Sequence, residues 1–135
     1  MKKVLVVCDT NSILSPLAEA YMNKFKKCKA EIYSFGIDNK PTNLSVIEVL
    51  VEDGITPGFN IICSLNELKA INFDYILSLS ANANSIIEKE FKTPLKFNYN
   101  FNITEKETKE NLEELRKEIK QYVERFCKMY LNEHQ

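Results

Sequence analysis

Short apolar runs separated by segments of helical periodicity run through the chain. Residues 2–7 (KKVLVV) form an apolar run of the kind that a buried parallel strand shows. Residues 31–36 (EIYSFG) alternate between polar and apolar, which is typical of a strand. Residues 73–80 (FDYILSLS), apolar and rich in β-formers, predict the central strand, and residues 94–101 (PLKFNYNF) predict another short one.

Helices are predicted between these strands. Ser15 and Pro16 suit the N-cap and first position of a helix that runs to about Cys28. Thr42 or Asn43 can cap a second helix, which Gly54 would end. Further helical segments are predicted at 64–68 (a short helix or turn), at 82–91, and at 106–131, where the apolar residues Leu112, Leu115, Ile119, Tyr122, Val123 and Phe126 share one face.

The alternation of strands and helices indicates the fold class. Strands that alternate with helices form a parallel sheet with helices on both faces. The chain of 135 residues is long enough for one such domain and too short for two. We therefore expect a single three-layer α/β domain, residues 1–135, around a four-stranded parallel sheet.

Composition and charge narrow the function classes. Hydrophobic residues make up 44% of the chain and charged residues 27%, and the net charge is -1, so no global field would attract nucleic acid or a membrane. The apolar run at the N-terminus is too short for a signal peptide, and no stretch approaches the roughly 20 apolar residues of a membrane span. These features predict a cytoplasmic protein of undetermined oligomeric state.

The cysteines and the single histidine exclude further chemistry. Cys8, Cys28, Cys63 and Cys127 lie far apart without a CxxC pair, so neither a disulfide framework nor a zinc site is expected. We predict no metal and no cofactor. His134 is the only histidine and lies next to the C-terminus, so a mechanism with a histidine base in the core is excluded.

The junction between the first strand and the first helix carries the candidate chemistry. Ligands of open parallel sheets bind beyond the carboxyl ends of the strands, where the amides and dipole of a helix N-terminus favour anions. The same field lowers the pKa of a nearby cysteine. We predict Cys8 as a nucleophile and an anion-binding loop formed by Asp9, Thr10, Asn11, Ser12, Ile13, Leu14 and Ser15. In the plain alternative, Cys8 is a small core residue, Ser15 an ordinary helix cap and Asn11 a turn former.

This junction resembles a known signature. VCDTNSILSPLAEA is similar to V-C-x-x-N-x-x-R-S-x-x-A-E of the low-molecular-weight protein tyrosine phosphatases, a superfamily that includes the thioredoxin-coupled arsenate reductases. The likeness continues through YSFGI, PTNLSVIEVLVEDGI, FDYILSLS and the terminal amphipathic helix, and so covers nearly the whole chain. It implies a flavodoxin-like fold.

The resemblance also implies roles for single residues. In the family a cysteine thiolate attacks phosphorus or arsenic while loop amides and an arginine hold the oxyanion. The residue at the position of Asn11 keeps the loop in shape, and the serine at that of Ser15 bonds the thiolate. An aspartate in a late D-P motif protonates the leaving group. Aromatic residues of the late loop line the cleft, which makes Tyr99 and Phe101 candidate wall residues, with simple packing as the alternative.

The loop departs from the signature at two positions. Leu14 stands in the place of the arginine and supplies neither charge nor a hydrogen-bond donor. Loss of such a contact lowers the rate by about a thousandfold or more. Arg116 and Arg125, both on the last helix, are the only arginines that could replace it. Asp9 puts a carboxylate beside the thiol, where it would repel phosphate and raise the thiol pKa, unless it points outward.

The general acid of the family is also missing. Asn102, Ile103 and Thr104 occupy the stretch that aligns with the D-P motif, and none of them is a proton donor of the required kind. Glu105 and Glu107 could substitute, but acidic residues at this place also suit the first turn of a helix.

A reductase would need a resolving cysteine. The family's reductases carry one just after the central strand, where this chain has Ser80. Cys28 and Cys63 could serve only if the fold brings them near Cys8. A thioredoxin-coupled cycle is therefore not expected.

These observations predict a phosphatase-like protein with weak or lost turnover that binds a phosphate-like oxyanion, a phosphorylated protein or another partner. Three alternatives remain open. In the first alternative the chain is an active phosphatase or arsenate reductase with a rebuilt site. In the second it is a redox switch that acts through Cys8. In the third alternative it is an interaction domain, with Ile13 and Leu14 in an exposed apolar patch at the mouth of the former pocket.

Overall fold

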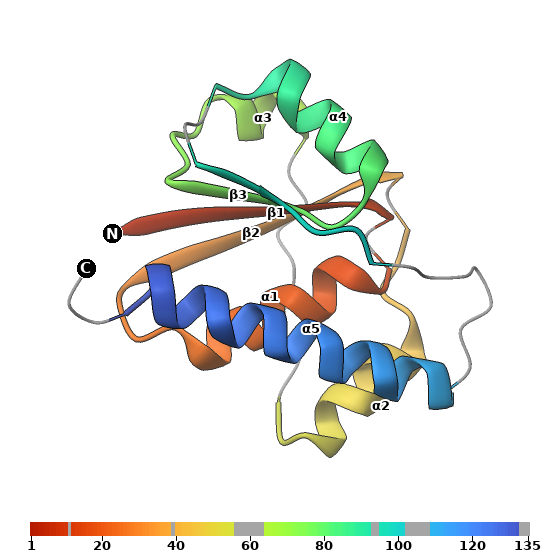
Figure 1. The fold of residues 1–135 in the computed structure, drawn as a ribbon. Helices are drawn as coiled ribbons and strands as arrows, with labels where there is room; N and C mark the ends of the chain where they lie inside the picture. The colour runs from red at the N-terminus through yellow and green to blue at the C-terminus, as the bar shows by residue number, and fades with distance from the viewer. Residues whose placement is uncertain (11, 39, 56–63, 93–94, 102–108, 133–135) are drawn as a thin grey trace.

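A parallel sheet forms the centre of the fold (Figure 1). The computed structural model describes residues 1–10, 12–38, 40–55, 64–92, 95–101 and 109–132. In this part of the chain the sheet has four strands in the order β2-β1-β3-β4, and each adjacent pair is parallel. The elements are β1 (Lys2–Thr10), α1 (Leu14–Phe25), β2 (Ala30–Asp38), α2 (Leu44–Glu52), α3 (Leu65–Lys69), β3 (Tyr75–Ser78), α4 (Ala81–Glu90), β4 (Lys96–Asn98) and α5 (Lys109–Tyr130).

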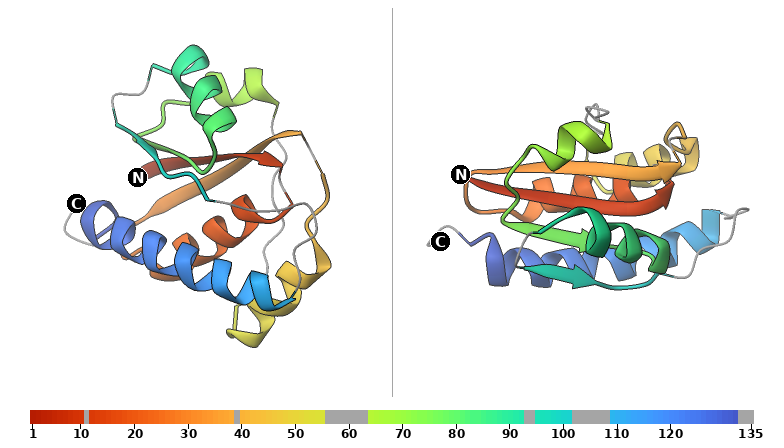
Figure 2. Two further views of the ribbon diagram at one scale, coloured as in Figure 1. Left: turned by 45° about the vertical axis from the view of Figure 1, so that its right-hand side comes forward. Right: turned by 90° about the horizontal axis from the view of Figure 1, so that it is seen from above.

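The helices cover both faces of the sheet. α1, α2 and α5 lie on one face, and α3 and α4 lie on the other, as Figures 1 and 2 show. Successive side chains of a strand point to opposite faces. Val4 and Val6 of β1 therefore pack in the core with α1 and α5, while Leu5 and Val7 pack in the core with α3 and α4. The predicted flavodoxin-like α/β fold is confirmed.

β1 is longer than its apolar run. The sequence predicted a strand over residues 2–7, but β1 continues to Thr10, because β2 runs on to Asp38 and supplies the backbone partners. Asp9 and Thr10 are thus strand residues, which corrects their assignment to the loop. Since the alternation persists to the end of the strand, Cys8 faces α1 and Asp9 faces the opposite side of the sheet.

α1 begins two residues earlier than predicted. Its first residue is Leu14 and its N-cap is Ile13, which makes no side-chain capping bond. The prediction of Ser15 as the N-cap and Pro16 as the first position is therefore wrong. Pro16 is still compatible with the helix, because the amide that it lacks would have no intrahelical partner in the first turn. Ser15 is a helix residue instead of the N-cap, and it is fully buried.

The predicted ends of α1 and α2 agree with the structure to different degrees. α1 ends at Phe25, short of the predicted end near Cys28. α2 begins as predicted, because the Asn43 side chain accepts a hydrogen bond from the Ser45 amide at 2.8 Å. Gly54 follows α2 with a φ of +74°, the left-handed conformation that glycine adopts most easily.

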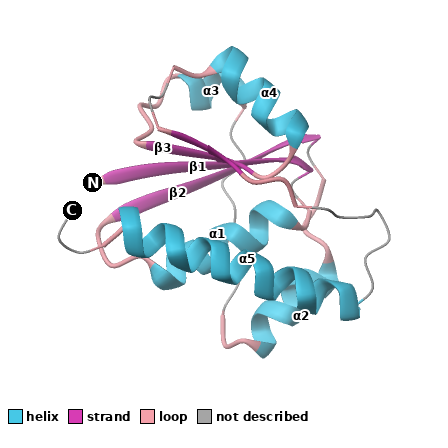
Figure 3. Ribbon diagram, in the orientation of Figure 1, coloured by secondary structure: helices cyan, strands magenta, loops and turns pink. Residues whose placement is uncertain are grey.

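The other predicted elements are present with shifted ends (Figure 3). The strands predicted at 73–80 and 94–101 are shorter, since only 75–78 and 96–98 pair with a neighbouring strand. α3, α4 and α5 differ from their predicted spans by up to three residues at either end. No helix in the described part of the chain is long and apolar enough to cross a membrane.

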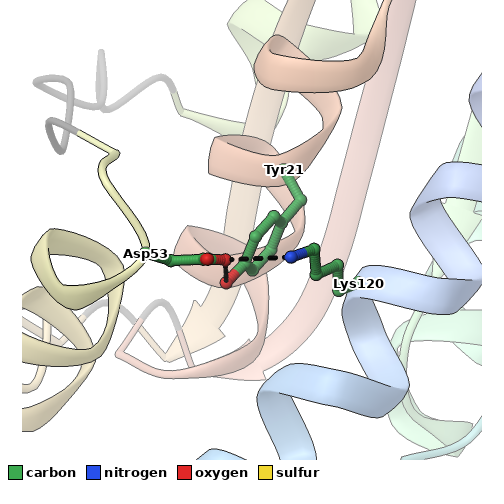
Figure 4. A network of polar contacts seen from close by, with 3 residues as sticks. All are labelled: Tyr21, Asp53 and Lys120. Carbon is green, nitrogen blue, oxygen red and sulfur yellow. Dashed lines mark hydrogen bonds and ion pairs between the residues drawn. The ribbon is translucent and has the colours of Figure 1, made fainter.

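A polar network joins α1, the end of α2 and α5 (Figure 4). The buried Tyr21 donates a hydrogen bond from its hydroxyl to Asp53 Oδ2 at 2.8 Å. Lys120 of α5 donates to the same oxygen at 3.3 Å, and its Nζ lies 5.7 Å from the centroid of the Tyr21 ring. The network fixes the three helices of this layer against one another.

Candidate active site

The candidate site lies at the carboxyl edge of the sheet, where the strand order changes direction. β1 lies between β2 and β3, and the chain leaves β1 toward α1 on one face and β3 toward α4 on the other. Such a switch point leaves a crevice beyond the strand ends. The Leu79 amide donates to the Val7 carbonyl at 2.9 Å, so the two strand ends stay together at this place.

Cys8 lies near the end of β1 and is only 1% exposed. Its Sγ is hydrogen-bonded to the hydroxyl of Ser15, the contact that the family resemblance implied. The same sulfur donates to the backbone carbonyl of Thr10. A carbonyl oxygen accepts and cannot donate, so this contact requires the proton on the sulfur, while the Ser15 hydroxyl can donate to it.

The surroundings of Cys8 favour a protonated thiol. Burial raises the pKa of Cys8, the side-chain and backbone hydrogen bonds with Ser15 oppose that effect, and the charge of Asp9 raises it further. The net pKa lies above the ordinary value of a cysteine. The prediction that the helix N-terminus would lower this pKa is wrong, because burial outweighs the hydrogen bonds with Ser15 at the start of α1.

Asp9 points neither outward nor at the thiol. Its carboxylate accepts a hydrogen bond from the Ser80 hydroxyl at 2.9 Å, which joins the end of β1 to the start of α4. Ser80 is the N-cap of α4, and its hydroxyl also accepts from the Ala83 amide at 3.1 Å. In the sequence, Ser80 stood out only as the position of an absent cysteine. A serine ahead of a predicted helix was the available signal for the cap, but nothing local indicated its bond to Asp9.

The described residues of the loop between β1 and α1 are joined to α2 by a hydrogen bond, and their apolar side chains are buried. Leu14, at the position of the family's arginine, is 3% exposed and packs in the same core as Ile13. The expectation that these two side chains form an exposed apolar patch is therefore wrong. The Ser12 carbonyl accepts from the Asn43 amide at 2.9 Å, which joins the loop to the start of α2. Asn11 lies outside the described residues.

Each arginine lies near a tyrosine of the helices that cover one face of the sheet. Burial raises the pKa of Tyr21, and the charge of the half-buried Arg116 opposes that rise, so Arg116 lies near α1. Burial likewise raises the pKa of Tyr122 to about 12 against an opposing effect of the exposed Arg125. The charge that acts on Cys8 is instead the carboxylate of its neighbour in β1.

The candidate wall residues follow β4 and pack against α5. Phe101 is buried in the core that also holds the thiol, and Tyr99 is 39% exposed. Their ring centroids are 4.5 Å apart, and the centroid of Tyr122 lies 5.1 Å from that of Tyr99, with the two rings tilted by 43°. The Tyr99 hydroxyl donates to Glu118 at 3.0 Å. The predicted general-acid stretch and its two possible substitutes, within 102–107, lie outside the described residues.

The described cysteines do not come together at the site. Cys28 lies two residues before Ala30, which pairs with the start of β1, whereas Cys8 lies near the end of that strand. At about 3.3 Å per residue this places them about 20 Å apart. Cys127 accompanies Cys28, because the two thiols interact electrostatically. Cys28 therefore cannot resolve Cys8 in this fold, and Cys63 lies outside the described residues.

A second acidic contact was missed by sequence reasoning. Glu19 of α1 accepts a hydrogen bond from the Ser34 hydroxyl of β2 at 2.9 Å. Burial raises the pKa of Glu19, and this bond opposes the rise. The contact joins α1, which begins at the loop, to β2, the strand beside β1. It therefore helps to fix the position of the candidate site. In the described part of the chain, no cluster of three His, Cys, Asp or Glu residues is suited to a metal ion.

Comparisons with known proteins agree with this geometry. Similar solved structures include a mutant of YwlE from Bacillus subtilis (17% identity, TM-score 0.82, covering 96% of this chain and 98% of that chain). An arsenate reductase in its oxidized state is 21% identical with a TM-score of 0.83, covering 96% of this chain and 98% of that chain. A low molecular weight protein tyrosine phosphatase from T. tengcongensis is 19% identical with a TM-score of 0.83, covering 96% and 99%.

These identities are low enough that the solved structures establish the fold alone. No curated protein matches the sequence. The family model described as low molecular weight phosphotyrosine protein phosphatase matches residues 3–134. The chain therefore belongs to the low molecular weight phosphotyrosine protein phosphatase family.

Proposed function

We propose that this chain is a phosphatase-family protein of the cytoplasm with lost or very weak turnover, which acts as a binding protein for a phosphate-like oxyanion or a phosphorylated partner. The observation that carries the proposal is the burial of Leu14. A bidentate guanidinium at this position would contact the oxygens of a phosphoryl group, and a leucine that is 3% exposed in the core offers no such contact.

The state of the thiol supports the same conclusion. The thiolate is the nucleophilic form of a cysteine. The pKa of Cys8 is raised, first by burial, and its sulfur donates to the Thr10 carbonyl. Only a small fraction of the protein then carries the thiolate near neutral pH. Oxyanion binding rests on the backbone amides and dipole at the start of α1, so we expect it to be weak.

The test is hydrolysis of p-nitrophenyl phosphate by the natural protein, Cys8→Ser and Leu14→Arg. Ile13→Arg is the matched control, because it places the same charge at an equally buried neighbouring position. We expect the natural protein and the control to be inert. Leu14→Arg should gain a slow turnover, which disappears when Cys8→Ser is added to that variant. Thermal denaturation of each variant identifies any that fails to fold.

The comparison of the natural protein with Cys8→Ser does not depend on the folding of the arginine variants. Turnover by the natural protein that disappears in Cys8→Ser would overturn the proposal and favour the active-enzyme alternative. The search for a replacement would then turn to Arg116, Arg125 and the lysines. Oxyanion binding is measured separately, by titration of inorganic phosphate against amide shifts of Cys8 and Ser15.

A further inference from the structure

The carboxylate of Asp9 has a defined place at the carboxyl edge of the sheet. It is half-buried at the end of β1, and the Ser80 hydroxyl holds it at 2.9 Å. That hydroxyl is itself fixed by the Ala83 amide at the start of α4. The carboxylate is next to Cys8 in the strand, and its charge acts on the thiol. A negative charge is thus fixed next to Cys8 in the strand, beside the loop to which the proposed function assigns the anion.

We propose that Asp9 is a charge-selecting residue that makes this site discriminate against doubly charged oxyanions in favour of singly charged or neutral ligands. The inference rests on the proposed function, since it concerns the ligand class of the same loop. Ser80 is the positioning residue, because its hydrogen bond keeps the carboxylate at the end of β1 instead of in solvent. The absence of an arginine and the presence of Asp9 then act in the same direction.

The size of the effect depends on the charge of the ligand. The Coulomb energy between the carboxylate and a bound anion is proportional to the anion's charge. The penalty in free energy for a dianion is therefore twice that for a monoanion of the same shape, and the factor in affinity is squared. A tenfold effect on a dianion corresponds to about a threefold effect on a monoanion.

Sulfate and perchlorate are suitable probes, because both are tetrahedral and they differ by one charge. Each is titrated at constant ionic strength against the natural protein and Asp9→Asn, with the amide shifts of Cys8 and Ser15 as the readout. Asparagine keeps the oxygen that accepts from Ser80, so the variant retains this contact and removes only the charge. We expect Asp9→Asn to bind sulfate about tenfold more tightly and perchlorate about threefold more tightly.

Asp38→Asn is the matched control. Asp38 is the last residue of β2 at the same edge of the sheet, its side chain is 69% exposed, and it pairs with Lys40 at 3.8 Å. The substitution changes the net charge by the same amount and leaves the hydrogen bond between Asp9 and Ser80 in place. We expect the affinities for both ions to stay within twofold of the natural values.

Alkylation of Cys8 provides a second measurement at the same atom. Iodoacetamide and iodoacetate offer the same carbon to the sulfur but differ by one negative charge. The tryptic peptide 4–24 carries Cys8 and no other cysteine, so its mass reports this site alone. Asp9→Asn should narrow the preference for the neutral reagent about threefold, and Asp38→Asn should not change it.

Equal gains for sulfate and perchlorate, no gain in Asp9→Asn, or the same gain in Asp38→Asn would overturn the inference. These results are separate from failure of the proposed function. Hydrolysis by the natural protein refutes the proposed function whatever the binding data show. An inert natural protein with an unchanged sulfate affinity in Asp9→Asn refutes only the charge selection.

Discussion

Removal of the Tyr21 hydroxyl tests whether the network between α1, α2 and α5 contributes to stability. In Tyr21→Phe the ring remains, so the core stays filled and the contact with Lys120 at 5.7 Å is kept. The lost interaction is the 2.8 Å hydrogen bond from a fully buried phenol to Asp53. The substitution therefore isolates one bond to a charged acceptor.

The expected loss can be worked out from the partners. A hydrogen bond to a charged group contributes about 1.5–3 kcal/mol to stability. The Asp53 side chain is 23% exposed and keeps Lys120 at 3.3 Å, so water can replace part of what is lost. We expect the free energy of unfolding to fall by about 1–2 kcal/mol, which corresponds to a decrease of roughly 3–8 °C in Tm for a domain of this size.

Urea denaturation of a double-mutant cycle measures the interaction itself. The cycle consists of the natural protein, Tyr21→Phe, Asp53→Ala and the double variant, and we expect a coupling of about 1 kcal/mol. Tyr33→Phe is the control, because Tyr33 also donates to a carboxylate, Glu31, but within one strand. Its loss should be below about 0.5 kcal/mol.

The pH dependence of the free energy of unfolding gives an independent check on the hydrogen bond between Tyr21 and Asp53. The pKa of Asp53 is lowered, first by the hydrogen bond from Tyr21 and then by Lys120. The stabilisation is thus fully present above the ordinary aspartate pKa of about 3.9 and is lost as the pH falls through the lowered pKa of the folded state. The difference between the natural protein and Tyr21→Phe should shrink below that pH. An equal loss in the Asp53→Ala background, or a difference that persists in acid, would refute the reasoning.

Three further predictions concern local structure and the thiols. Gly54→Ala should lower the free energy of unfolding by about 1 kcal/mol, because φ is +74° although no atom lies within 4 Å of the added Cβ; an unchanged urea midpoint would contradict this. Asn43→Ala should lower it by about 1 kcal/mol through loss of the α2 cap, measured in the same way. In a time course of iodoacetamide labelling followed by mass spectrometry, Cys28, which is half-buried, should react before Cys8 and Cys127, since burial raises the pKa of Cys8 and raises that of Cys127 to about 12; early labelling of Cys8 would show an open, ionised thiol.

The signals in the sequence that predicted the fold are local ones. Asn43 caps α2 through an amide two residues away, and Gly54 ends the helix through its own backbone conformation. The alternation of apolar runs and helical periodicity predicted the parallel sheet, because each element must bury its apolar face against the next layer. These features depend on neighbours within a few residues, so they are legible without a structure.

The tertiary structure decided the chemistry of the site. The length of β1 depends on the partner strand that runs beside it to Asp38, and this extension sends Cys8 and Asp9 to opposite faces of the sheet. The protonation of Cys8 follows from burial by segments distant in the chain. The bond between Asp9 and Ser80 joins residues 71 positions apart. The sequence by itself determined the family, the fold and the missing arginine. The protonation of Cys8, the position of the Asp9 carboxylate and the burial of the loop side chains depend on contacts between remote segments, which no local pattern encodes.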